Sequence, residues 1–262
     1  MSEGDLSSQA HPPPQRLRRH WRSGLSSLYQ FLWGKGGLDA AFEGMLALAG
    51  PMVQREFDRF AQDPVGQRLL AEQPRRELNE LLKDEDALAA MPKGSFADAY
   101  LGYMGLEGMG SADDFLAAAD LEKKGKRFGW SEDQLWFVRR MANSHDLFHV
   151  MSGYGRDIIG EIGVDAYTAG QIRLLPLRLL LAYFFFLKPS SPIGWPLFVI
   201  RCYRHGRRTP SLSCVDYEAI FELPLDEARR RVGAQAVAEV HLNGLPTPGR
   251  TLRRIEAKIE GR

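Results

Sequence analysis

Apolar residues recur three and four positions apart through almost every ordered stretch of this sequence, whereas alternating runs of β-branched residues are scarce. Leu, Ala, Glu, Arg and Gln, all of which favour helix, are frequent. This pattern predicts an all-α protein. The sequence shows no internal repeat and no second composition regime, so we expect a single-domain helical bundle over residues 16–262.

The first residues differ from the rest of the chain. Residues 1–15 are polar and run into three consecutive prolines without an apolar segment, so we expect a disordered tail rather than a secretory signal. Residues 16–33 combine a basic start with many aromatic and apolar side chains. We interpret them as an amphipathic helix suited to an anionic lipid surface, although a transit peptide has a similar composition.

Charge and cysteine content exclude several kinds of protein. The 34 Lys and Arg residues nearly balance the 33 Asp and Glu residues, so no global field favours nucleic acid. The two cysteines, Cys202 and Cys214, are too few for a disulfide framework and fit a reducing compartment. Together with His205 they offer three zinc ligands, but the sequence shows no obvious fourth.

Glycines, prolines and capping residues divide the chain into expected helices. We expect Gly50 and Pro51 to separate two helices, and 123–129 to form a charged loop. The apolar segment 172–187 spans 16 residues, fewer than the roughly 20 that cross a bilayer, which predicts a buried or interfacial helix. The other expected helices cover 38–48, 52–61, two short segments after Pro64 and Pro74, 96–104, 112–121, 130–151, 157–169, 216–222, 226–232 and 252–259.

Two histidines lie on the best-defined of these helices, 130–151, whose start carries a capping box formed by Ser131 and Gln134. His145 and His149 are four positions apart, which places both imidazoles on one helix face, about 6 Å apart between Cβ atoms. Their neighbours in the sequence are mostly apolar, and burying two imidazoles without a partner or an ion would be costly. The pair therefore predicts a divalent metal site.

Glu161 is the candidate third ligand. In one straight helix it would lie about 18 Å from His149 along the axis, out of reach. Residues 152–155, Ser-Gly-Tyr-Gly, favour a turn instead. A helix hairpin with its bend there brings Glu161 opposite the histidines, so we expect the metal site on that hairpin.

Asp146 is less easily placed, because it is offset by about 100° from His145 around the helix. It fits a fourth ligand, a partner that orients an imidazole, or a general base. The donor types accept zinc, iron, manganese and other ions, so the residues leave the metal open.

The order His145-Asp146-Leu147-Phe148-His149, then eleven residues, then Glu161, resembles the motif of the ubiquinone (coenzyme Q) biosynthesis protein 4 family. The resemblance extends over about residues 38–232. It is also carried by residues that flank the motif, namely Gly153, Gly160, the apolar segment that follows and the stretch 217–229.

The resemblance implies an all-helical, peripheral membrane protein of quinone biosynthesis in which His145, Asp146, His149 and Glu161 hold a divalent ion, usually taken to be zinc. It implies C1 decarboxylation of a polyprenylated hydroxybenzoate intermediate, a lyase activity, with hydroxylation at the same carbon in an oxidative version. The expected location is cytoplasmic, on the inner face of the membrane, or at the mitochondrial inner membrane in a eukaryote. Expected partners are the quinone precursor, other quinone-biosynthesis enzymes and a second copy of the chain, without nucleic acid.

Two other functions fit the same residues. A zinc hydrolase shares the two-histidine spacing, with Asp146 where such enzymes carry a glutamate base. A non-catalytic scaffold that binds prenyl lipids would use the metal for structure. For either a scaffold or an enzyme, the basic clusters in 16–22 and 201–208 are candidate headgroup contacts, and 172–187 and 195–200 are candidate walls of a groove for the prenyl tail.

Overall fold

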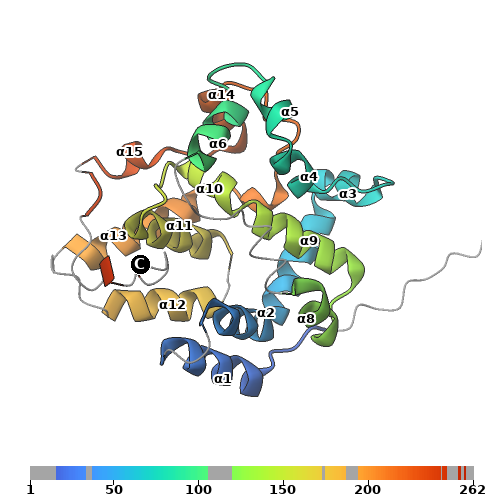
Figure 1. The fold of residues 1–262 in the computed structure, drawn as a ribbon, viewed down its shortest axis with the longest axis vertical. Helices are drawn as coiled ribbons and strands as arrows, with labels where there is room; N and C mark the ends of the chain where they lie inside the picture. The colour runs from blue at the N-terminus through green and yellow to red at the C-terminus, as the bar shows by residue number, and fades with distance from the viewer. Residues whose placement is uncertain are drawn as a thin grey trace, which may run out of the picture.

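Helices form almost all of the regular structure in the computed structural model (Figure 1). The structure describes residues 16–33, 37–105, 120–172, 175–186, 194–242, 244–246, 253–254 and 257. Within them no strand forms, and one isolated antiparallel bridge joins Ser95 to Pro224. The all-α prediction is confirmed. The helices are α1 (Trp21–Leu32), α2 (Gly37–Gln62), α3 (Pro64–Ala71), α4 (Leu78–Lys83), α5 (Glu85–Ala89), α6 (Phe96–Met104), α8 (Leu121–Arg127), α9 (Glu132–Asn143), α10 (His145–Ser152), α11 (Ile158–Gln171), α12 (Leu175–Phe186), α13 (Gly194–Arg208), η1 (Leu212–Cys214), α14 (Leu225–Val232) and α15 (Val237–Val240).

The long helix α2 runs through Pro51, so the prediction of two helices separated there was wrong. Proline has no N–H to give to the carbonyl four residues earlier, which is that of Ala47. The backbone N–H of His20 donates to this carbonyl instead, at 2.7 Å. The segment that enters α1 thus satisfies the group that Pro51 leaves unpaired, and the helix continues.

Two apolar clusters form the core. One joins α2, α3, α8 and α9 around side chains such as Phe60, Leu69 and Phe137. The other joins α6, α10, α11, α12 and α13 and includes Leu147 and Tyr167. The candidate hairpin α10–α11 lies in the second cluster, near the middle of the view in Figure 1.

The structure differs from two further predictions, the loop at 123–129 and the unbroken helix over 130–151. Residues 121–127 form α8 rather than a loop, since Leu121 is buried and Lys126 pairs with Glu122 one turn earlier. The predicted helix 130–151 is divided into α9 and α10 at Ser144, whose hydroxyl donates to the carbonyl of Arg140 at 2.8 Å. Such bonds from serine to the preceding turn bend helices.

The predicted helix 216–222 was also wrong, because this segment forms turns. Backbone carbonyls at the end of this segment instead accept hydrogen bonds from α6. The N–H groups of Phe96 and Ala97, at the start of α6, donate to the carbonyls of Leu223 and Phe221. Long-range bonds therefore replace the local ones that a helix would need.

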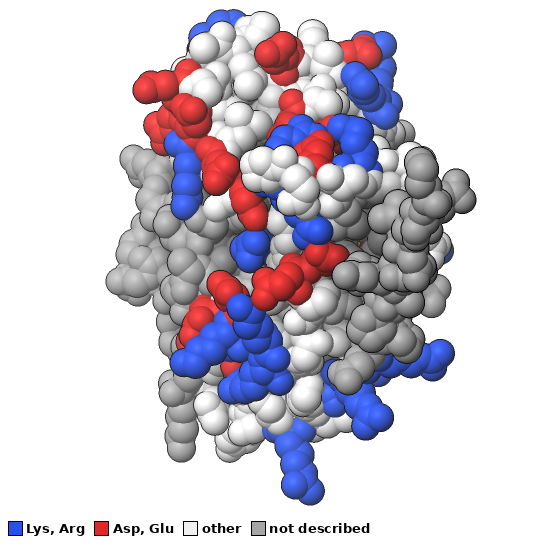
Figure 2. All heavy atoms as spheres, turned by 90° about the vertical axis from the view of Figure 1, so that its right-hand side faces the viewer, with Lys and Arg blue, Asp and Glu red and all other residues white. Residues whose placement is uncertain are grey.

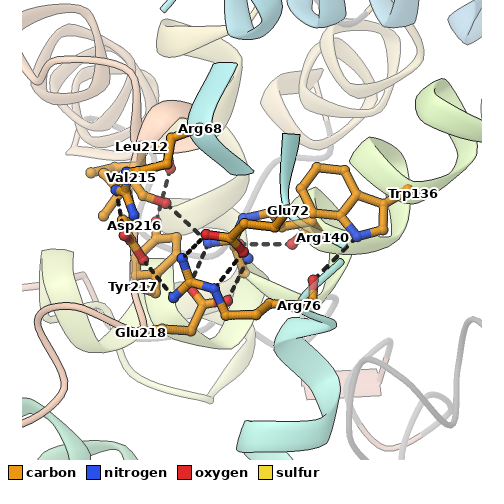
Figure 3. A network of polar contacts seen from close by, with 11 residues as sticks. Arg68, Glu72, Arg76, Trp136, Arg140, Leu212, Val215, Asp216, Tyr217 and Glu218 are labelled. Atoms are coloured by element: carbon orange, nitrogen blue, oxygen red, sulfur yellow. Dashed lines mark hydrogen bonds and ion pairs between the residues drawn. The ribbon is translucent and has the colours of Figure 1, made fainter. Parts of the chain in front are cut away.

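A network of arginines and carboxylates anchors the same segment to α3, to the connection between α3 and α4, and to α9 (Figure 3). Arg140 of α9, which is 4% exposed, makes two hydrogen bonds to Glu218, at 2.7 and 2.6 Å. Arg68 donates to Asp216 at 2.6 Å, and Arg76 lies 3.6 Å from the same carboxylate. Although burial opposes it, these two guanidinium groups hold the pKa of Asp216 below its usual value.

Charges of both signs are interspersed over the upper and middle parts of the face shown in Figure 2, whereas its lower end shows Lys and Arg without Asp or Glu. The expected tail 1–15 lies outside the described residues, as do 106–119 and most of 247–262. Among the helices that are described, none combines the length and apolarity needed to span a bilayer.

Candidate metal centre

The two histidines lie on α10, a short helix whose first residue is His145. His149 follows one turn later and is fully buried, whereas the side chain of His145 is 37% exposed. The bend at Ser144 sets the direction of this helix separately from that of α9.

A tight turn connects α10 to α11. Gly153 ends α10 with φ +79, and its N–H donates to the carbonyl of His149. Asp157 begins α11 and accepts from the N–H groups of Ile159 and Gly160. A Cβ on Gly160 would lie 1.8 Å from the carbonyl oxygen of Gly155, so only glycine fits directly before Glu161.

This turn brings three predicted residues together, because Glu161 lies in the first turn of α11 and faces both histidines. The two Nε2 atoms are 3.3 Å apart, and Oε2 of Glu161 is 3.5 Å from His145 Nε2 and 3.4 Å from His149 Nε2. Tetrahedral zinc, with bonds of about 2.0–2.1 Å, holds its ligand atoms about 3.4 Å apart. The three donors therefore have the spacing that one tetrahedral ion requires.

A backbone carbonyl sets the tautomer of His149. Its Nδ1 lies 3.0 Å from the carbonyl oxygen of Tyr154, which can only accept, so Nδ1 carries the proton. The lone pair of Nε2 then points toward His145 and Glu161. Partners of this kind orient the histidines of metal sites and raise their basicity.

Glu161 and His145 each shift the pKa of the other. Although burial opposes the charged form, the hydrogen bond and charge of Glu161 raise the pKa of His145 to about 9. Burial also opposes ionisation of Glu161, but the two neighbouring imidazoles, His145 first, hold its pKa well below the usual range. Glu161 is thus already in the form that binds a cation, whereas His145 must release a proton.

Asp146 is the predicted site residue that the structure does not bring into this group. It is half-buried on α10, and its charge contributes to raising the pKa of Tyr100 and Tyr103, although burial of the two phenols is the larger cause. Its charge also contributes to raising the pKa of His145, so Asp146 lies beside the centre but outside the group of three ligand atoms.

Two residues beside the site were not predicted from the sequence. Tyr103 of α6 stacks on the ring of His149, with centroids 5.2 Å apart, and no local pattern linked these distant segments. Asp165 lies one turn after Glu161, and burial raises its pKa to about 7. Its spacing of four from Glu161 was a signal that the sequence did contain.

The alternative zinc ligands are not gathered into one site. Within the described residues, His145, His149 and Glu161 are the group of His, Cys, Asp or Glu close enough to share an ion. His205 instead donates through Nε2 to the carbonyl of Gln235, and Cys202 lies 3.6 Å from Nε2 of His241.

The chain matches one protein family and relatives that carry the corresponding name. The family described as "Coenzyme Q (ubiquinone) biosynthesis protein Coq4" matches residues 41–238. The chain is 30% identical over 185 residues to the "Ubiquinone biosynthesis protein COQ4 homolog, mitochondrial" of Bos taurus, covering 67% of this chain and 63% of the relative. The Homo sapiens protein of the same name is 28% identical over 197 residues, covering 72% and 67%. The match thus spans somewhat less than two thirds of the bovine relative.

A crystal structure described as a ubiquinone biosynthesis protein from Nostoc punctiforme shares the fold. Its TM-score is 0.59 at 22% sequence identity, and the match covers 82% of this chain and 99% of that one.

Proposed function

Because the chain belongs to the Coq4 family of coenzyme Q (ubiquinone) biosynthesis proteins, we propose that His145, His149 and Glu161 bind one zinc ion and act in this pathway on a polyprenylated hydroxybenzoate. The role in ubiquinone biosynthesis follows from family membership. The proposed reaction is decarboxylation at C1 of the ring, in which CO₂ leaves and a proton takes its place. In the oxidative version a hydroxyl takes its place, which requires a two-electron oxidant such as dioxygen in addition to the metal.

The spacing of the three ligand atoms, 3.3 to 3.5 Å, is the observation that carries the metal proposal. An octahedral ion with bonds of about 2.1 Å would set neighbouring ligands about 3.0 Å apart, so the spacing favours a tetrahedral ion. Three protein ligands leave the fourth position of such an ion open.

Exposure distinguishes a catalytic from a structural centre. The side chains of His145 and Glu161 are 37% and 31% exposed, whereas a structural zinc site is closed by protein ligands. A partly open centre supports the enzyme over the scaffold. The placement of Asp146 beside the centre but outside the three ligand atoms supports a role as a base or an orienting group.

When bound, the ion would neutralise the substrate carboxylate or phenolate and stabilise charge that develops on the ring. The chain's own residues hold the donors in place. The carbonyl of Tyr154 keeps the proton of His149 on Nδ1, and the ring of Tyr103 covers the imidazole. This cover limits the access of water to one side of the centre.

Fewer residues are proposed to contact the prenyl tail than the sequence suggested, because several of the expected ones are buried. Leu177, Leu181 and Phe198 are buried in the core. Among the described side chains of these two segments, the exposed large apolar ones are Leu179, Leu197 and Ile200. Location at the inner face of a membrane, a second copy of the chain and other quinone-biosynthesis enzymes remain part of the proposal.

Incubation of zinc-loaded protein with a short-tailed prenyl hydroxybenzoate tests the reaction, with mass spectrometry of the product. Loss of CO₂ alone supports decarboxylation, and replacement of the carboxylate by hydroxyl supports the oxidative version. Glu161→Gln should be inactive. Ser131→Ala should be active, because Ser131 caps the end of α9 that is remote from the metal centre. Complementation of a deletion strain by a metal-free, folded Glu161→Gln variant would instead favour the scaffold.

A further inference from the structure

Helix α1 presents an exposed row of large apolar side chains. Trp21, Leu25, Tyr29 and Trp33 follow one another at intervals of four, which places them along one side of the helix. Their exposed fractions lie between 48% and 64%. We call these four residues the aromatic row.

The opposite side of α1 is firmly packed. Ser27 is buried, as is Leu17 in the segment that leads into the helix. The N–H of His20 donates to the carbonyl of Ala47 in α2. In Figure 1, α1 lies at one end of the long axis with α2 between it and most of the other helices. The aromatic row therefore belongs to a folded helix and faces away from the body of the protein.

The same segment is strongly basic. Residues 16–33 contain four arginines and no Asp or Glu, whereas the whole chain has a net charge of +1. Arg18, Arg19 and Arg22 are all exposed, and the guanidinium of Arg19 lies 5.7 Å from the ring centroid of Trp21. Positive charge thus surrounds one end of the aromatic row.

We propose that α1 docks the protein onto an anionic lipid bilayer, with the aromatic row in the headgroup region and Arg18, Arg19 and Arg22 on the lipid phosphates. Tryptophan and tyrosine concentrate at the membrane–water boundary, because their rings are apolar and carry one polar group. Juxtaposed arginines gain from the negative surface potential of anionic lipids. A helix with both features lies flat in that boundary.

Charge favours an anionic lipid surface over a second copy of the chain as the binding partner of α1. A second copy of α1 would offer further arginines and no carboxylate, because residues 16–33 contain no Asp or Glu, whereas anionic lipids supply phosphates to pair with Arg18, Arg19 and Arg22. The helix also precedes residues 41–238, the part that matches the family, so family membership assigns it no role. The proposal does not depend on metal binding.

Tryptophan fluorescence tests the contact directly, because the other three tryptophans, Trp130, Trp136 and Trp195, are buried. The full chain is mixed with vesicles of equal parts phosphatidylglycerol and phosphatidylcholine that carries bromine in its acyl chains. We expect quenching of Trp21 and Trp33. The double variant Trp21→Phe, Trp33→Phe should still sediment with the vesicles, but its remaining emission should not be quenched.

Vesicle sedimentation gives the second measurement. Replacing Arg18, Arg19 and Arg22 by Gln should weaken binding on the order of 100-fold, since each arginine contributes about fivefold. Trp21→Gln with Trp33→Gln should weaken it at least about tenfold. The matched control is Arg230→Gln with Arg231→Gln, on α14 at the opposite end of the long axis, which should bind as the wild type does.

Three results would overturn the proposal. These are unchanged sedimentation of the arginine-to-glutamine and tryptophan-to-glutamine variants, equal binding of the wild type to vesicles of phosphatidylcholine alone, and loss of a dimer by the tryptophan-to-glutamine variant with vesicle binding intact. Folded, metal-free Glu161→Gln should bind vesicles normally, so this result is separate from failure of the proposed reaction.

Discussion

The α10–α11 centre and the arginine network of α9 both bring charged side chains into the interior, but they differ in how the groups meet. In the network, opposite charges lie at hydrogen-bond distance, as in the two bonds of 2.6 and 2.7 Å between Arg140 and Glu218. In the centre, three potential ligand atoms lie 3.3 to 3.5 Å apart, too far for strong hydrogen bonds.

This difference separates a structural cluster from a binding site. The network supplies both partners from its own side chains, and it fixes the turns that begin at Asp216 (Figure 3). The centre supplies donors whose spacing suits an added cation. We therefore expect changes in the network to alter folding, and changes in the centre to alter metal binding.

The largest expected effect on stability is that of Arg140→Leu. Removing one partner of a buried ion pair leaves Glu218 uncompensated, which should lower the free energy of unfolding by about 3–5 kcal/mol. Urea denaturation measures the change. The double variant Arg140→Leu, Glu218→Leu should recover part of the loss, and zinc affinity should be unchanged in both. A loss of zinc affinity in a variant that remains folded would remove the distinction between the two regions.

His145→Ala should abolish the stabilisation that zinc provides. At a free zinc concentration about 100 times the dissociation constant, the wild type should gain about 2.7 kcal/mol. The variant should gain almost nothing under the same conditions. Thermal unfolding with zinc and with a chelator gives both values, and an equal gain in the variant would exclude His145 as a ligand.

Two helix caps offer a matched comparison. Asp157 caps α11 beside the centre, and Ser131 caps α9 away from it. Replacing either by Ala should cost about 1 kcal/mol of stability. Only Asp157→Ala should also weaken zinc binding, by about tenfold, because it loosens the turn that presents Glu161. Equal zinc affinities, measured by competition with a chelating dye, would show that this turn does not position the ligand.

Asp146→Asn should have the smallest effect. The carboxylate lies outside the three-ligand group, so zinc affinity should stay within about threefold of the wild type. Isothermal titration calorimetry measures it. Should the affinity fall as far as in His145→Ala, Asp146 would be a ligand after all.

Local signals predicted much of the centre. The Ser131–Gln134 capping box is present, and the glycine turn brings Glu161 to the histidines. These features depend on residues close in sequence, and caps and turns are properties of such segments.

Long-range contacts explain the predictions that were wrong. α2 continues through Pro51 because the distant N–H of His20 satisfies the freed carbonyl, and residues 216–222 form turns because α6 binds their carbonyls. The contact of Tyr103 with His149 has the same character. A spacing pattern along one segment cannot reveal a partner from another segment.

The most direct test of the central claim is zinc titration of the wild type and Glu161→Gln, followed by X-ray absorption spectroscopy of the loaded wild type. We predict one zinc ion per chain, bound by two imidazoles, one carboxylate and a non-protein oxygen, and a folded variant whose affinity is reduced at least about 100-fold. A wild type that binds no divalent ion, or a Glu161→Gln variant with unchanged affinity, would contradict the account.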